Sequence, residues 1–268
     1  MDRTAVLQTL DQERQTVAPF GTTLAAAPNV VRAFGPLWSG IAFSRFARSE
    51  SDRVIDQEIN YWSARQKSFE WTVYDHDEPP DLTAKLRQRG FKIGNEEALM
   101  ILDVADVPET LLVYPQEKIE IKRVTDEGTI ADLLSVQKAI WNNKRLTPAV
   151  FRARLKDPLQ RDVAFLAYCD EEPVAFARLT SSPDSEFAGL WSGSVLEEYR
   201  GKGVYRALLA ARIALAKTRS SVRYLRVDAL PTSRPILQKY GFIDLAKTWP
   251  CDWAAGTERK SRKATSGF

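Results

Sequence analysis

The sequence predicts an α/β protein (α+β in the mixed order of its strands) made of two similar units, each a mixed sheet with flanking helices. Apolar positions alternate along the chain between a period of 2 and a period of 3.6. The order strand, turn, helix, strand, helix and Gly-Phe occurs once in each half. With 268 residues, of which 44% are hydrophobic, the chain is long enough to bury two cores.

In the first half, helical and strand-like segments alternate. Val54, Ile55, Ile59 and Trp62 recur at the spacing of one helix face. Gly90 follows another helical segment, and glycine commonly ends a helix in a left-handed conformation. The expected elements, in order, are a helix over 2–18, a strand over 39–43, a polar turn over 48–52, a helix over 52–66, a strand over 69–74, a helix containing Leu82 and Leu86, and a strand over 98–103.

The second half begins after a short segment that carries two prolines and acidic residues. Asp170–Pro173 is a hairpin turn signal, and the residues from Val204 place apolar side chains on one helix face. The expected elements are a strand over 119–124, helices over 126–140 and 147–155, strands over 163–168, 174–180 and 187–195, a helix over 204–217, a strand over 224–229, and a last helix before Gly241.

These elements predict four regions. They are a first domain over 1–103, a linker over 104–118, a second domain over 119–253, and a basic tail over 254–268 that we expect to be disordered.

Two short motifs recur at nearly the same spacing and support duplication of one unit. The run from Phe34 to Gly40 shares Phe-x-x-Leu-Trp-Ser-Gly with the run from Phe187 to Gly193. Leu86-x-x-x-Gly-Phe is matched by Leu237-x-x-x-Gly-Phe. We therefore expect the second half to repeat the first.

The segment from Val195 to Arg206 predicts an anion site. It joins the end of a strand to the start of a helix through a turn that contains Gly201 and Gly203. The first amides of a helix have no partner within the helix, and the helix dipole adds positive charge there. Glycines let a phosphate approach the backbone. Three cations, at positions 200, 202 and 206, supply countercharge.

The first half carries an acidic turn at the corresponding position. Arg48–Asp52 has no glycine, and Glu50 and Asp52 place two carboxylates in the turn. We expect Asp52 to cap the following helix and thereby to occupy its free amides. The sequence therefore predicts that only the second half binds the anion.

Other phosphate sites and other compartments are disfavoured. A Rossmann fingerprint needs a third glycine where Arg206 stands, and Walker A and kinase signatures are absent. The net charge of +3 gives no case for nucleic acid. The longest nearly apolar run, 207–216, is too short for a bilayer. One histidine, His76, expected at the surface, and two distant cysteines indicate no metal and a cytoplasmic protein.

On these motifs, residues 119–253 resemble the GCN5-related N-acetyltransferase (GNAT) family. Arg200-Gly-Lys-Gly203-Val-Tyr205 matches the family's Gln/Arg-x-x-Gly-x-Gly/Ala motif in its first five positions. The resemblance extends through the following helix and strand to Gly241-Phe242. Residues 20–103 resemble the same fold more weakly, so the whole is similar to a tandem GNAT protein with a degenerate N-terminal copy.

The resemblance implies transfer of an acetyl group from acetyl-CoA, as cosubstrate, to the amine of a small molecule or peptide. It implies no partner of nucleic acid or membrane and a monomer or homodimer. A slot for the pantetheine arm would open where the strands ending at Val195 and Asp228 splay apart. The implied cofactor-binding residues are Gly193, Ser194, Val195, Arg200, Gly201, Lys202, Gly203, Val204, Tyr205 and Arg206.

Two departures from the family pattern bear on the chemistry. Tyr205 stands at the motif's last Gly/Ala position, and we expect its side chain to point away from the cofactor. Leu237 occupies the position of the usual tyrosine acid, so Tyr240, Ser233 or a water would substitute. The reaction needs a base, an oxyanion contact and an acid.

The candidate catalytic residues are Glu198, Asp228 and Tyr240, and Glu197 is the neighbour of the first. Two other functions stay open at this point. The chain could be a CoA-binding sensor without turnover, or a structural protein that has lost the site.

Overall fold

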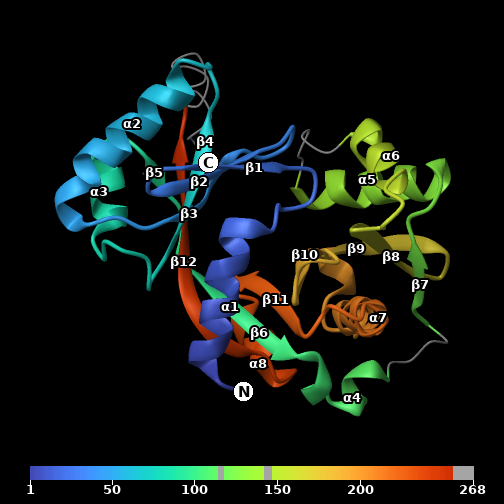
Figure 1. Cartoon of the computed structure of the whole chain (residues 1–268). Helices are drawn as coiled ribbons and strands as arrows, with labels where there is room; N and C mark the ends of the chain where they lie inside the picture. Colours follow the sequence, from blue (N-terminus) through green and yellow to red (C-terminus); the bar gives the residue numbers. More distant parts are fainter. Residues whose placement is uncertain (114–117, 142–146, 256–268) are drawn as a thin grey trace. The chain divides into compact units, whose positions relative to one another are not determined.

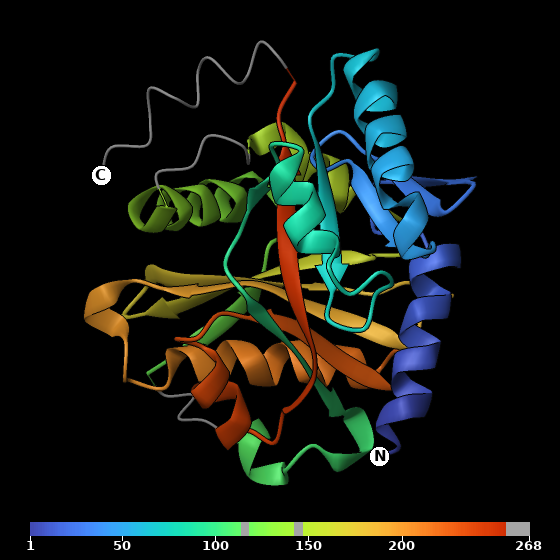
Figure 2. The same ribbon diagram turned by 90° about the vertical axis from the view of Figure 1, so that its left-hand side faces the viewer.

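The computed structural model describes residues 1–113, 118–141 and 147–255, and it confirms the α/β class (Figures 1 and 2). The chain forms two compact units. Unit 1 comprises Met1–Met100, Asp228–Arg234 and the residues from Asp244 onward, and unit 2 comprises Ile101–Val227 and Pro235–Ile243. The units are discontinuous in sequence, so they do not coincide with the expected ranges 1–103 and 119–253.

Unit 1 is built on a mixed sheet. Its strand order is β1-β2-β3-β4-β12-β6, and β5 also pairs with β12. Strand β3 runs parallel to β4, whereas β12 runs antiparallel to β4. The elements that lie wholly or partly in this unit are α1 (Arg3–Thr16), β1 (Thr23–Ala27), β2 (Val30–Phe34), β3 (Gly40–Ser44), α2 (Ser51–Ser63), β4 (Phe69–Tyr74), α3 (Leu82–Gln88), β5 (Lys92–Ile93), β6 (Glu97–Asp103) and β12 (Ile243–Trp253).

An aromatic core holds unit 1 together. Helices α2 and α3 lie side by side against the sheet (Figure 1). The Trp62 ring stacks on Phe69 at 5.1 Å between centroids, and Phe69 also meets Trp253 at 5.8 Å. Trp62 and Trp71 are fully buried. Because Trp253 belongs to β12, the core of unit 1 needs the last strand.

Four strands of unit 1 were missing from the sequence prediction: β1, β2, β5 and β12. β1 and β2 form a hairpin in which Ala27 pairs with Val30. Asn29 makes that turn possible with a left-handed φ of 75°, which asparagine adopts more readily than most residues. Of the predicted tail, Ala254 and Ala255 are described, and Ala255 is buried, with its amide donating to Ser68 Oγ. The remainder of the tail lies outside the described residues.

Unit 2 has its sheet between two layers of helices. The strand order is β11-β10-β9-β8-β7, with β10 parallel to β11. Helices α5 and α6 cover one face, and α7 lies along the other (Figure 1). The elements are α4 (Glu109–Leu112), β7 (Glu120–Arg123), α5 (Glu127–Trp141), α6 (Pro148–Leu155), β8 (Asp162–Cys169), β9 (Glu172–Thr180), β10 (Phe187–Val195), α7 (Val204–Lys217), β11 (Tyr224–Ala229) and α8 (Arg234–Lys239).

Helices α3 and α8 end in the same way. Gly90 and Gly241 are left-handed, with φ of 88° and 91°. The amide of Phe91 donates to the Leu86 carbonyl, and the amide of Phe242 donates to the Leu237 carbonyl. These bonds close a Schellman motif over a buried Leu-Phe contact. This sequence match therefore corresponds to a shared structure.

The other sequence match, Phe-x-x-Leu-Trp-Ser-Gly, does not correspond to a shared structure. Phe34 ends β2 and Gly40 begins β3, whereas the run from Phe187 to Gly193 lies inside the single strand β10. What the two units do share is an order of elements. In each, an antiparallel hairpin leads to a strand, a helix, a parallel strand and a short helix that ends in Gly-Phe.

We predict that Gly241→Ala lowers the free energy of unfolding by about 1–2 kcal/mol, because an L residue is strained at φ of 91°. Space is not the obstacle, since an added Cβ would lie 3.5 Å from Leu102 Cδ1. Urea denaturation checks it. Gly128→Ala, in the first turn of α5, is the matched control and should be neutral or stabilising. Equal effects of the two substitutions would contradict the role of the left-handed backbone.

Candidate functional site

The glycine turn has the predicted backbone geometry. Gly201 and Gly203 are left-handed, with φ of 73° and 86°. Gly203 is the N-cap of α7 and has no side chain to occupy the helix amides. Among the described residues, no acceptor lies within hydrogen-bonding distance of the amides of Lys202, Val204 or Tyr205. The turn therefore presents unpaired N–H groups at a helix start, as an anion site requires.

The three cations of the turn differ in their contacts. Arg200 and Lys202 are exposed; Arg200 Nε donates to the Val195 carbonyl at 3.3 Å, and Lys202 Nζ lies 5.1 Å from the Tyr199 ring centroid. Arg206 instead donates a hydrogen bond to the carbonyl of Thr110 in α4. Two of the three cations can thus turn toward an anion at the surface, while the third is held by a neighbouring helix.

Strand β10 is irregular where the pantetheine arm is expected. Its register against β9 shifts between Trp191 and Ser194, and Ser192 has a left-handed φ of 58°. Its ladder with β11 pairs Phe187–Gly189 with Tyr224–Arg226. The ladder ends before Gly193, as the expected splay requires. A bulge of this kind frees backbone groups of the strand for another partner.

The side chain of Tyr205 is not where the sequence led us to expect it. A Cβ built on Gly193 would lie 2.9 Å from Tyr205 Cε2. The ring thus packs against the strand predicted to bind the cofactor instead of pointing away. The absence of a side chain at Gly193 is what makes room for the tyrosine.

The acidic turn of the first half differs in detail from the prediction. Helix α2 begins at Ser51, so Asp52 lies inside its first turn and makes no cap hydrogen bond. The Asp52 carboxylate instead lies 3.2 Å from Arg89. Glu50 accepts from the amide of Ala47 at 3.3 Å and from Arg53 at 2.6 Å. The expected N-cap was wrong, because the N-cap of α2 is Glu50, two residues before Asp52.

The three candidate catalytic residues lie in different surroundings. Glu198 is exposed in a short 3-10 turn. Tyr240 is half-buried after α8, where its amide donates to the Leu237 carbonyl. Leu237 is fully buried. Asp228, half-buried in β11, lies close enough to Glu97 for its charge to raise the pKa of that glutamate.

A carboxylate cluster in unit 1 surrounds Asp228, and the sequence did not reveal it. Glu70 on β4 stands directly opposite Asp252 on β12. Burial, with Asp228 and Glu70 close by, raises the pKa of Glu97 on β6 to about 7. Burial likewise raises the pKa of Glu70, although a hydrogen bond from Thr72 opposes it. The cluster therefore contains a carboxyl group that exchanges a proton near neutral pH.

A local signal for this cluster exists in β4. Along Phe69–Tyr74, polar Glu70 and Thr72 alternate with Trp71 and Val73, so they face away from the aromatic core. No comparable signal marks Glu97, because its neighbours in the cluster come from strands that are distant in sequence.

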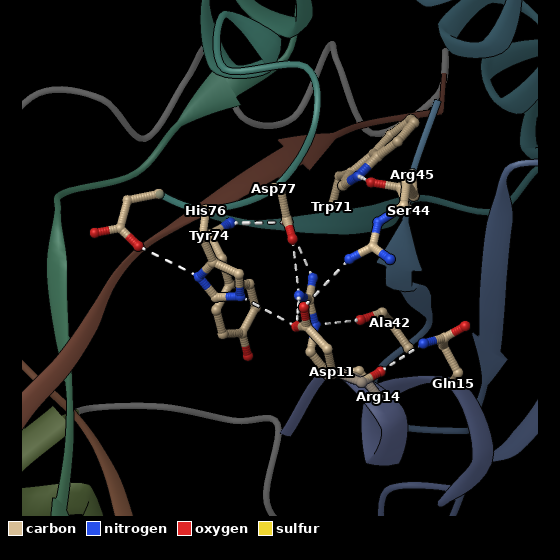
Figure 3. A network of polar contacts seen from close by, with 11 residues as sticks. Asp11, Arg14, Gln15, Ala42, Ser44, Arg45, Trp71, Tyr74, His76 and Asp77 are labelled. Atoms are coloured by element: carbon tan, nitrogen blue, oxygen red, sulfur yellow. Dashed lines mark hydrogen bonds and ion pairs between the residues drawn. The ribbon is translucent and has the colours of Figure 1, made fainter. Parts of the chain in front are cut away.

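A second polar cluster in unit 1 joins α1 to the turn after β4 (Figure 3). Arg14 Nη1 and Nη2 lie 2.8 and 3.0 Å from the two carboxylate oxygens of Asp77. Arg14 also contacts Asp11 at 2.9 Å and lies 3.7 Å from the Tyr74 ring centroid. His76 Nε2 lies 3.1 Å from Asp11 Oδ1, so the histidine is half-buried in this network and not simply at the surface.

Asp11, His76 and Asp77 could in principle hold a metal, since their ligand atoms lie within 4.8 Å of one another. The guanidinium of Arg14 already satisfies both oxygens of Asp77. A cation placed beside Arg14 would meet its positive charge at close range. The donor set is therefore a poor fit for a metal and a good fit for a structural ion-pair network.

Comparison with known proteins places this site in context. Residues 130–242 match the model of the Acetyltransferase (GNAT) family. No protein of curated function matches the chain. In the part of the chain that the structure describes, no helix is both long and apolar enough to cross a membrane.

Solved structures share the fold over nearly the whole chain. A GCN5-related N-acetyltransferase from Kribbella flavida is 16% identical with a TM-score of 0.66, covering 95% of each chain. One from Sphaerobacter thermophilus is 14% identical with a TM-score of 0.61, covering 94% of this chain and 91% of that one. A tandem GNAT protein of the clavulanic acid biosynthesis pathway is 14% identical with a TM-score of 0.57, covering 92% and 88%.

We predict that the pKa of His76 in the folded protein lies above 6.5, since the hydrogen bond to Asp11 raises it more than burial lowers it. The pair then stabilises the fold fully below pH 6.5, and this contribution is lost as the pH rises through the folded pKa. Because His76 is the single histidine, its NMR titration is unambiguous.

Asp11→Asn should lower this pKa and destabilise the protein more at pH 6 than at pH 9. Asp75→Asn is the control, because Asp75 Oδ1 makes only a 3.4 Å contact with His76. A wild-type pKa at or below 6.5 would contradict the network.

Proposed function

We propose that the protein transfers the acetyl group of acetyl-CoA to the amine of a small molecule or peptide, because residues 130–242 match the model of the Acetyltransferase (GNAT) family. The observation that carries this proposal is the turn at the start of α7. Gly201 and Gly203 take left-handed conformations there, and amides of the turn have no acceptor among the described residues. A pyrophosphate is the anion that such a turn would hold in this family.

The donor would lie along unit 2. The amides from Gly201 to Arg206 would hold its pyrophosphate, with Arg200 and Lys202 as mobile countercharges. Gly193–Val195 would lie along the pantetheine arm, past the point at which the β10–β11 ladder ends. The bulge in β10 would supply a backbone N–H for the thioester carbonyl, whose oxygen gains charge during attack.

We propose that Glu97, with Asp228 as its neighbour in unit 1, exchanges a proton near neutral pH. A carboxyl group with a pKa of about 7 is half ionised at neutral pH and is a far better proton acceptor than an ordinary glutamate. The charges of Asp228 and Glu70 also attract an ammonium group to the same place. Glu198 is exposed and lies outside this cluster, so it is a weaker candidate for proton exchange.

The proposed transfer is a single displacement of the CoA thiolate by the amine. A general base takes one proton from the acceptor ammonium, the free amine attacks the thioester carbon, and the nitrogen loses its second proton to solvent as the amide forms. A C–N bond forms and the C–S bond breaks, leaving the CoA thiolate. Tyr240 remains the nearest hydroxyl in sequence to the missing tyrosine at Leu237 and is our candidate for protonating the thiolate.

Unit 1 would be the degenerate copy of a tandem GNAT protein. The shared order of elements and the shared Schellman endings support this reading. Both cysteines are free, which suits a reducing compartment such as the cytoplasm. A CoA sensor without turnover remains the second candidate.

Gly203→Asp should weaken acetyl-CoA binding at least tenfold, because a carboxylate would repel the pyrophosphate and compete for the helix amides. Gly203→Asn is the matched control. It has the same size and the same tolerance of a left-handed φ, here 86°, but no charge. Calorimetric titration measures both. Unchanged affinity in the aspartate variant would show that the donor binds elsewhere.

The raised pKa of Glu97 can be tested by the stability of the folded protein. A carboxyl group whose pKa is raised on folding destabilises the native state as the pH rises from about 4.5 to about 7. Glu97→Gln should therefore gain stability relative to the wild type at pH 8 and not at pH 4. No such gain would contradict the raised pKa, whatever the activity shows.

A further inference from the structure

An arginine on α7 is buried without a carboxylate. Arg212 is 1% exposed. Its Nε donates to the Leu208 carbonyl at 3.0 Å, and its Nη2 has no hydrogen-bond partner. Among the described residues, no carboxylate forms an ion pair with it. Arg154, another buried arginine of unit 2, does have one, with Asp162 Oδ2 2.9 Å from its Nε.

The guanidinium of Arg212 lies under the bulge of β10. A Cβ built on Gly193 would stand 3.6 Å from Arg212 Nη2. The Tyr205 ring lies beside it, with its centroid 5.9 Å from Arg212 Cζ. Gly193 lies beyond the last pair of the β10–β11 ladder, which joins Gly189 to Arg226. The free donor therefore faces the stretch of β10 expected to lie along the acyl end of the cosubstrate.

An unpaired buried charge is costly for the fold. Removing a guanidinium from water without a counterion is among the largest penalties a side chain can incur. The Leu208 carbonyl supplies one acceptor but no negative charge. Burial accordingly lowers the pKa of Arg212, and the Tyr205 hydroxyl only partly offsets it. A ligand that brings an anion to Nη2 would complete the pair, preferably a carboxylate, which matches a guanidinium in shape.

We infer that this site prefers an acyl-CoA whose acyl group ends in a carboxylate, such as a succinyl group, and that Arg212 is the residue that selects it. The inference rests on the proposed function, since it assumes that the thioester of CoA lies along Gly193–Val195. The transfer step is unchanged, with the C–N bond formed and the C–S bond broken at the thioester carbon. Only the far end of the acyl group differs from acetyl.

Calorimetric titration of the full chain with free CoA, butyryl-CoA and succinyl-CoA tests the inference. Butyryl and succinyl groups have the same number of carbons and differ in the terminal carboxylate. The wild type should bind succinyl-CoA at least about tenfold more tightly than butyryl-CoA, because a charge-assisted hydrogen bond is formed. Arg212→Met should bind the two equally, and Arg212→Lys should keep part of the preference.

Arg154→Met is the matched control. It removes another buried arginine, 8% exposed, from the same unit, yet leaves Asp162 paired with Arg178 at 2.6 Å. It should keep the wild-type ratio of affinities. Equal binding of the two acyl-CoAs by the wild type would overturn the inference, even if Arg212→Met failed to fold. Loss of the preference in Arg154→Met would overturn the role of Arg212. If free CoA itself fails to bind, the proposed function falls with it.

Discussion

The antiparallel ladder between β4 and β12 is the constraint on which unit 1 depends. It pairs Phe69 with Trp253 and Tyr74 with Thr248, residues separated by most of the chain. The ladder brings Trp253 into the aromatic core and sets Asp252 opposite Glu70. One set of backbone hydrogen bonds thus fixes both the packing of the unit and two members of its carboxylate cluster. Shifting the register by one residue would exchange their faces.

The turn before α7 in unit 2 and the turn before α2 in unit 1 differ in backbone conformation and in charge. In unit 2, left-handed glycines leave helix amides available, and cations flank them. In unit 1, the turn at Glu50 is acidic and its charges are taken up by Arg53 and Arg89. In unit 1, burial together with nearby Asp228 and Glu70 raises the pKa of Glu97.

Local sequence patterns predicted most of the helices and strands. The features that they missed depend on pairing between strands that are distant in sequence. β4, β10, α7 and β11 have the bounds read from the sequence, because each is a single apolar period between clear turn residues. β12 was missed because Pro250, a residue that sheets rarely contain, stands within it, and its pairing with β4 and β5 defines it. The turn that contains Gly201 and Gly203 is formed by neighbouring residues, so it could be predicted from the sequence. The environment of Glu97 depends on strands far apart in sequence and could not.

The discontinuity of unit 1 also sets the timing of its assembly during synthesis. β4 leaves the ribosome long before Trp253 is added, and at roughly 5–20 residues per second the wait is on the order of ten seconds. Until then the edge of β4 that will receive β12 has no partner, and the Trp62–Phe69 stack lacks its third ring. Until the last strand is made, the open edge of β4 can therefore pair with another chain.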